Sequence, residues 1–236
     1  MTSGLAEAWE RYWRELPTTP GAAPWDGDAT AHVAEHVPLF QPYFEPDLPL
    51  LDVGCGNGRQ TLFLGTCFPR VIGLDVSATA VERAMAGYVP DNVEFRQLDL
   101  LDNAAVAELA DELGDVNIYM RTVLHQLPPE MKPAAAANLA RLVGARGHVF
   151  ALELSPEAGE LLGAMADDEA AIPKVKRVMG YGIVAAQWSG QDERHLLEAA
   201  GLRLLESGRT RVQTTDHLGD GSPLVLPADY VVANRA

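Results

Sequence analysis

The chain has 236 residues, 47% of them hydrophobic, and its 18 basic and 33 acidic side chains give a formal charge of -15 at pH 7. This apolar fraction is ample for one large core, so a wholly disordered chain is excluded, and one domain is the default at this length. The acidic balance argues against nucleic acid and anionic membranes as partners, because both are bound chiefly through clustered Lys and Arg side chains.

Neither the cysteines nor the N-terminal residues indicate a secreted or membrane-bound protein. Cys55 and Cys67 are too few for a disulfide framework, and they lack the clustered His of a zinc site. The N-terminal residues have neither the basic region nor the apolar region of a signal peptide. No run of about 18 apolar residues is present. We therefore expect a cytoplasmic protein that does not bind membranes.

Residues 1–47 are rich in aromatic side chains and contain two predicted helices, 5–16 and 30–44, separated by a loop rich in proline and glycine. Residues 48–155 then alternate short apolar strands with helices, which is typical of a buried parallel sheet with right-handed crossovers. The predicted strands are 48–53, 71–75, 93–98, 116–120 and 148–154, and the predicted helices are 59–68, 78–88, 104–113 and 129–143.

Residues 156–236 are predicted to form the substrate side of the domain and begin with three predicted helices, 157–168, 172–178 and 191–200. The first two are inserted between the fifth and sixth strands, where they shape either the substrate pocket or a dimer contact. A strand over 202–211 and a last strand over 230–234, connected through the loop HLGDGSP, should be antiparallel neighbours. The whole chain, 1–236, is therefore predicted to be one α/β domain. Its sheet has seven mostly parallel strands, helices on both faces and an antiparallel last strand.

The most informative segment is LLDVGCGNGRQ, residues 50–60, where a strand ends in Asp52 and Gly54, Gly56 and Gly58 follow. Closely spaced glycines let the backbone turn sharply and approach a ligand at the carboxyl end of the strand. The spacing differs from the G-x-G-x-x-G fingerprint of dinucleotide sites, and no Gly-Lys-Ser/Thr of a phosphate-binding loop is present. Asp52 suits a ligand with a cationic group better than it suits a pyrophosphate.

Two further acidic residues end the next two predicted strands. Asp75, in VIGLDVS, is placed to accept both hydroxyls of a ribose. Asp99, in FRQLDLLD, could accept from an adenine amino group, with Leu100 against the ring. Any one of these carboxylates could be a helix cap or a turn residue. Three at consecutive strand ends favour one ligand that is cationic and rich in hydroxyls.

These segments together resemble the class I S-adenosylmethionine-dependent methyltransferases, in particular the branch that acts on small molecules. The matching segments are LLDVGCGNGRQ, VIGLDVS, EFRQLDLLD and YMRTVLHQL, and they lie within residues 48–155. The resemblance implies a Rossmann-like fold with S-adenosylmethionine as cofactor. The cofactor-binding residues that it implies are Asp52, Gly54, Cys55, Gly56, Gly58, Asp75, Val76, Asp99, Leu100, Arg121 and Thr122, with 121–122 near the amino acid end.

Candidates for catalysis and substrate binding are fewer. His125 follows the fourth predicted strand and could be a general base or a substrate contact, or a packing residue. Glu153 could face the substrate or cap the next helix. The N-terminal segment 1–47 acts as a lid in many small-molecule members of the family, so Tyr12, Trp13 and Trp25 are candidates for enclosing the substrate; simple packing is the alternative.

Two other histidines, His32 and His36, are predicted to lie on a solvated helix face. No carboxylate cluster follows the fourth strand, so we expect no metal.

The function predicted from these features is methyl transfer to oxygen, nitrogen or sulfur of a small organic molecule. The alternative is a protein of the same fold that binds S-adenosylmethionine without methylating. The fourth strand lacks the Asn/Asp-Pro-Pro-aromatic motif of enzymes that methylate DNA bases. The net charge favours a neutral or cationic acceptor, and we expect a monomer or a homodimer.

Overall fold

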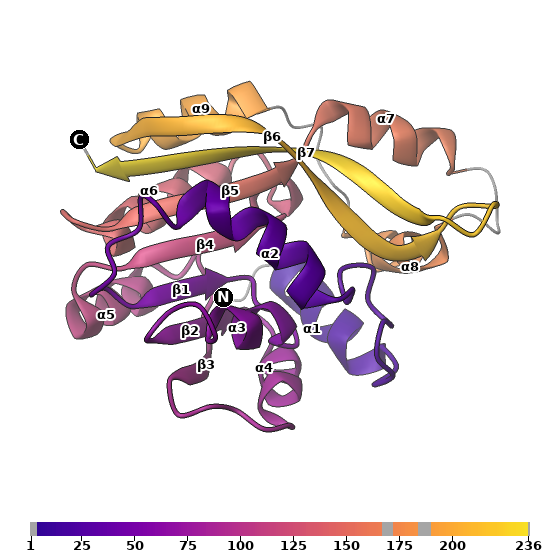
Figure 1. Ribbon diagram of the computed structural model, residues 1–236, viewed down its shortest axis with the longest axis horizontal. Helices are drawn as coiled ribbons and strands as arrows, with labels where there is room; N and C mark the ends of the chain where they lie inside the picture. The colour runs from indigo at the N-terminus through magenta and orange to yellow at the C-terminus, as the bar shows by residue number, and fades with distance from the viewer. Residues whose placement is uncertain (1–3, 167–171, 184–189, 236) are drawn as a thin grey trace.

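The protein is described here by a computed structural model that covers residues 4–166, 172–183 and 190–235. One seven-stranded sheet organises the molecule, in the order β3-β2-β1-β4-β5-β7-β6 (Figure 1). Every pairing up to β5 is parallel, and β7 runs antiparallel to both of its neighbours. The predicted sheet is therefore confirmed. The strands are β1 Leu50–Val53, β2 Val71–Asp75, β3 Val93–Gln97, β4 Asn117–Arg121, β5 His148–Leu154, β6 Leu202–His217 and β7 Pro223–Arg235.

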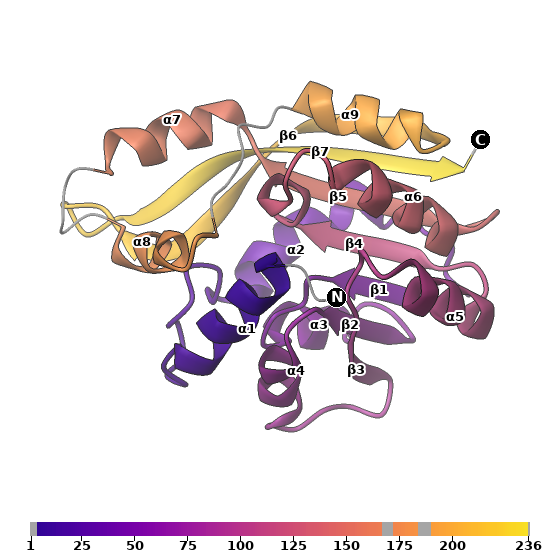
Figure 2. The ribbon, with the colours of Figure 1, turned by 180° about the vertical axis from the view of Figure 1, so that it is seen from behind.

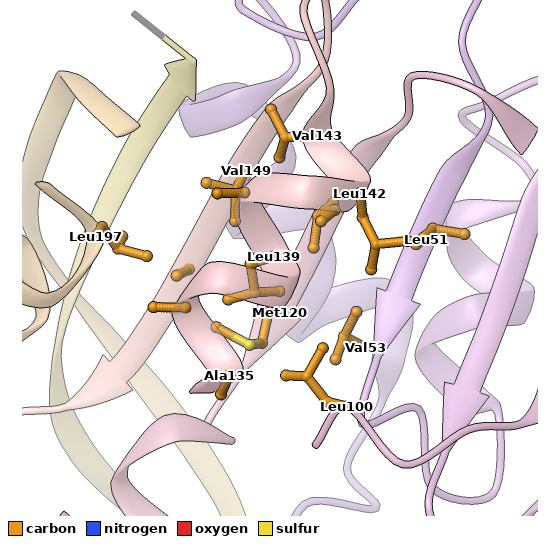
Figure 3. Close-up of a cluster of buried hydrophobic side chains, with 14 of the residues drawn as sticks. Leu51, Val53, Leu100, Met120, Ala135, Leu139, Leu142, Val143, Val149 and Leu197 are labelled. Carbon is orange, nitrogen blue, oxygen red and sulfur yellow. The ribbon is translucent and has the colours of Figure 1, made fainter. Parts of the chain in front are cut away.

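Helices cover both faces of the sheet, as predicted, because successive strand residues point to opposite faces and both sets are apolar. Leu51 belongs to the core under α5, α6 and α9, whereas Leu50 belongs to the core under α2, α3 and α4. Figure 3 shows the first of these cores around Leu139 and Met120. The helices are α1 Gly4–Glu15, α2 Ala29–Phe40, α3 Arg59–Leu64, α4 Ala78–Met85, α5 Asn103–Leu113, α6 Lys132–Val143, α7 Pro156–Ala164, α8 Pro173–Gly180 and α9 Gly190–Ala199, with a 3-10 turn, η1, at Leu124–Gln126.

The C-terminal hairpin is much longer than predicted. The predicted loop forms its turn, but β6 continues to His217 and β7 begins at Pro223. β7 includes Pro223 and Pro227, and this part of the hairpin is a two-stranded extension in which a missing N–H is tolerated. The paired strands extend past β5 toward α7 and α8 (Figure 1). The last residues of the predicted helix 157–168 lie outside the described part of the chain.

The N-terminal helix α1 lies beside α4, as Figure 2 shows. Glu10 on α1 accepts hydrogen bonds from the Ser77 hydroxyl at 2.7 Å and from the backbone N–H of Thr79 at 3.2 Å, at the beginning of α4. Carboxylates are stabilised at a helix N-terminus. This contact therefore docks α1 at the carboxyl ends of β1 and β2. None of the helices described is both long and apolar enough to cross a bilayer.

Candidate active site

The glycine turn after β1 is held in a conformation that favours glycine. Gly54, Gly56 and Gly58 have φ angles of 78°, 55° and 78°, in the left-handed region. A Cβ on Gly56 would lie 2.8 Å from Cζ2 of Trp13, so the turn passes directly under the N-terminal segment. A Cβ on Gly58 would lie 2.6 Å from the Phe95 ring. The first two glycines shape the ligand side, and the third allows close packing.

The Asp75 side chain at the end of β2 ties this turn to α4. Its Oδ2 accepts the backbone N–H of Gly56 at 2.8 Å, and its Oδ1 accepts that of Ser77 at 2.9 Å. Burial raises the pKa of Asp75 to about 6, although the two hydrogen bonds act to lower this pKa. The group is therefore ionised at neutral pH. Each carboxylate oxygen also keeps a lone pair that can accept a hydrogen bond from a ligand hydroxyl.

The other two strand-end carboxylates lie at the same edge of the sheet. Asp52 accepts the Thr61 hydroxyl at 2.6 Å, and burial raises the pKa of Asp52 to about 6, although Arg121 and Thr61 oppose this rise. Asp99 accepts the backbone N–H of Leu101 at 2.9 Å. The three carboxylates predicted from consecutive strand ends are thus brought together around one cavity.

This cavity, called the cofactor cavity below, lies over the carboxyl ends of β1, β2, β3 and β4. It is lined by every residue that we predicted to bind the cofactor except Gly58. Cys55 is among them, and burial raises the pKa of its thiol, so it is a packing residue and not a nucleophile. Lining residues that the sequence analysis missed include Trp9, Asp26, Asn57, Arg59, Gln60 and Gln126. Asp26 accepts from the Asn57 amide at 2.8 Å, which links the N-terminal loop to the glycine turn.

A second cavity of about 270 Å³, called the acceptor cavity below, adjoins the first. The two share Trp25, Thr122 and Gln126. Most of its walls come from α7, α8 and the extended hairpin. Its lining is largely apolar, with Leu154, Leu162, Val175, Val178, Met179, Ile183, Val212 and Leu226, and its polar members are Thr122, His125, Gln126 and Thr214. No Lys, Arg, Asp or Glu of the described residues lines it. Its volume far exceeds the roughly 10–15 Å³ that one water needs.

His125 lies in η1 and lines the acceptor cavity. Its Nδ1 pairs with Oε2 of Glu153 at 2.5 Å. Glu153 also accepts the backbone N–H groups of Val123 at 3.0 Å, Leu124 at 2.7 Å and His125 at 3.3 Å. Because this carboxylate accepts the Nδ1 proton, the lone pair of the imidazole is left on Nε2. Glu153 is 1% exposed and lines neither cavity, so it orients His125 without reaching the cavity itself.

The aromatic residues of the N-terminal segment form one cluster over the cavities. Trp13 lines the cofactor cavity and Trp25 lines both cavities. Tyr12 is fully buried and lines neither, since it packs against Trp9, Trp13, Trp25 and Tyr181 at ring-centroid distances of 5.4–5.7 Å. Tyr12 therefore supports the walls from behind.

The prediction that His32 and His36 lie on a solvated face is wrong. They are 9% and 1% exposed, because α2 packs against the sheet and both residues share the inward face with Val33 and Val37. The Nε2 of His36 donates to the carbonyl oxygen of Arg211 at 3.1 Å. Burial lowers the pKa of His36 to about 4, so the ring is neutral. The described residues contain no cluster of three or more His, Cys, Asp or Glu side chains suited to a metal ion.

The fold and the acidic, glycine-lined cavity define a Rossmann-like protein built to hold a nucleoside-type cofactor. The family model for a methyltransferase domain matches residues 50–147. A crystal structure of an S-adenosylmethionine-dependent methyltransferase from Anabaena variabilis is 33% identical, with a TM-score of 0.92 over 100% of this chain and 96% of that chain. The chain belongs to the S-adenosylmethionine-dependent methyltransferases.

Two curated plant relatives match a smaller part of the chain. Thiocyanate methyltransferase 1 of Brassica oleracea is 29% identical over 61% of this chain and 60% of its own length. Probable thiol methyltransferase 2 of Arabidopsis thaliana is 33% identical over 64% of this chain and 63% of its own length. The alignments thus span less than two thirds of either relative.

S-adenosylmethionine is the cofactor of this family, and the residues of the cofactor cavity fit it. The lone pairs of Asp75 suit the ribose hydroxyls, and Leu98, Leu100 and Leu101 provide an apolar wall beside Asp99. The buried carboxylate of Asp52 suits a positively charged group.

Proposed function

We propose that this chain transfers the cofactor's methyl group to sulfur, oxygen or nitrogen of a small organic molecule that occupies the acceptor cavity. The observation that carries the proposal is the junction of the two cavities at Trp25, Thr122 and Gln126, with His125 beside it. A cofactor on the glycine turn and an acceptor between α7, α8 and the hairpin would meet there.

The main task of the protein in methyl transfer is to align the acceptor atom with the methyl group of the cofactor. When bound, S-adenosylmethionine supplies a methyl group already activated by its sulfonium. Holding two reactants in line is then the largest contribution to the rate. The apolar walls and the aromatic cluster serve this purpose by fixing the acceptor and excluding water.

His125 supplies the remaining step when the acceptor still carries a proton. Its Nε2 lone pair takes that proton, and the imidazolium that forms is stabilised by Glu153 at Nδ1. Among the three acceptor atoms, the relatives named for thiocyanate and thiols favour sulfur. The apolar cavity supports an acceptor with an apolar body.

The test compares His125→Gln with His148→Gln, because His148 is also buried but begins β5 at the opposite end of the strand from Glu153. Turnover is measured with methyl-labelled cofactor and three acceptors of one size, benzenethiol, phenol and aniline. His125→Gln should slow methylation of a protonated acceptor by about 100-fold or more, with unchanged affinity for S-adenosylhomocysteine. His148→Gln should leave both unchanged. If His125→Gln turned over at the wild-type rate, the assignment of His125 as the general base would be refuted.

A further inference from the structure

Arg121, the last residue of β4, carries a buried positive charge without a partner. The residue is 7% exposed, and both Nη1 and Nη2 are buried with no hydrogen-bond partner. Among the described residues, no acidic side chain forms an ion pair with it. Burial of an unpaired guanidinium is strongly unfavourable, so a counter-charge is expected when the site is in use.

Among the described residues, no acidic side chain lies close enough to Arg121 to form an ion pair with it. On β1, the Asp52 carboxylate accepts the Thr61 hydroxyl, and Arg121 lowers the pKa of Asp52 from a longer distance without a direct contact. On α2, His32 and His36 face Arg121, and their pKa values are lowered by burial first and by Arg121 second. Both rings are therefore neutral, and Nδ1 of His36 also lacks a partner. Both terminal nitrogens of the guanidinium are thus left without a direct hydrogen-bond partner.

The position of Arg121 connects this charge to the reaction site. Arg121 lines the cofactor cavity, and the next residue, Thr122, lines both cavities. The acceptor cavity itself has no charged lining among the described residues. Among the described residues that line the two cavities, Arg121 and the more exposed Arg59 are the arginines, and Arg121 directly precedes Thr122 at the junction.

We infer that Arg121 is a specificity-determining residue that binds an anionic group, such as a carboxylate, on the methyl acceptor. The inference rests on the proposed function, since it assigns a substrate class to that same site. A guanidinium matches a carboxylate through two parallel hydrogen bonds. An anionic acceptor differs from the neutral or cationic acceptor that we expected from the net charge of -15. Exposed surface charges are screened by salt, whereas one buried cation at the site is not.

The test is calorimetric and needs no turnover. Benzoate and benzamide, which have the same shape but differ in charge, are titrated into protein saturated with S-adenosylhomocysteine. Wild type should bind benzoate roughly tenfold or more tightly than benzamide. Arg121→Met should lose this preference and Arg121→Lys should keep part of it. Arg141→Met removes an exposed cation on α6 that lines neither cavity and should keep the preference in full.

Two results would overturn the inference. One is equal binding of benzoate and benzamide by the wild-type protein, which does not depend on any variant folding. The other is a loss of S-adenosylhomocysteine affinity in Arg121→Met as large as the loss for benzoate, which would assign the guanidinium to the carboxylate of the cofactor. A benzoate preference without methylation of any acceptor would contradict the proposed function and leave the anion site standing.

Discussion

Replacement of Asp75 by Asn tests the role of the cofactor cavity most sharply. The carboxylate accepts backbone N–H groups of Gly56 and Ser77 with different oxygens, and each oxygen has a second lone pair. Asn keeps one carbonyl oxygen and turns the other acceptor into a donor. One charge-assisted bond to a ribose hydroxyl is then lost, at a cost of about 1.5–3 kcal/mol. This equals a loss of roughly 10- to 150-fold in affinity.

The assay is isothermal titration of S-adenosylhomocysteine into wild type and Asp75→Asn. Asp102→Asn makes the same chemical change at an exposed helix cap outside both cavities, so it is the matched control. It should lower stability slightly and leave affinity unchanged. If Asp75→Asn stays folded and binds within about twofold of wild type, the ribose assignment is refuted.

Two further predictions concern pH and the glycine turn. Burial raises the pKa of Asp75 to about 6 from its ordinary value of 3.8, so its ionisation disfavours folding above pH 6 and this penalty disappears below pH 4. The free energy of unfolding of Asp75→Asn, measured with urea relative to wild type, should therefore fall as pH is lowered from 7 to 4; a constant difference would contradict the burial argument. Gly56→Ala should lower the free energy of unfolding by about 1–3 kcal/mol, because the new Cβ would meet Trp13 and the backbone has a φ of 55°. Gly159→Ala on α7, where nothing lies within 4 Å, should be neutral or stabilising, and equal effects of the two changes would refute the close approach.

Much of the cofactor cavity is predictable because parallel strands bring their carboxyl ends to one edge. Asp52, Asp75 and Asp99 are far apart in the chain, yet strand order alone places them together. The left-handed conformations of the glycines are also predictable, because closely spaced glycines after a strand indicate a sharp turn. Gly58 lies beside the Phe95 ring and is not among the residues that line the cavity, and sequence spacing alone does not tell a ligand contact from a packing contact.

The sequence places helices 157–168 and 172–178 at a substrate pocket or a dimer contact, but the shape of the acceptor cavity depends on tertiary packing of weakly patterned segments and could not be predicted. The hairpin extension contains prolines and half-buried positions, so it does not show the clean alternation of a strand. The burial of His36 depends on which face of α2 meets the sheet. The missing partner of Arg121 is likewise invisible in sequence, where arginine usually indicates an exposed side chain.

The central claim is that the two adjoining cavities bring the cofactor and an acceptor together for methyl transfer. The most direct measurement quantifies labelled methyl product and S-adenosylhomocysteine in the same reaction with an acceptor that bears both a thiol and a carboxylate, 4-mercaptobenzoate. The two should form in equal amounts, with methylation at sulfur. Consumption of cofactor without a methylated acceptor, or binding of cofactor without any turnover on this acceptor and the three smaller ones, would contradict the claim.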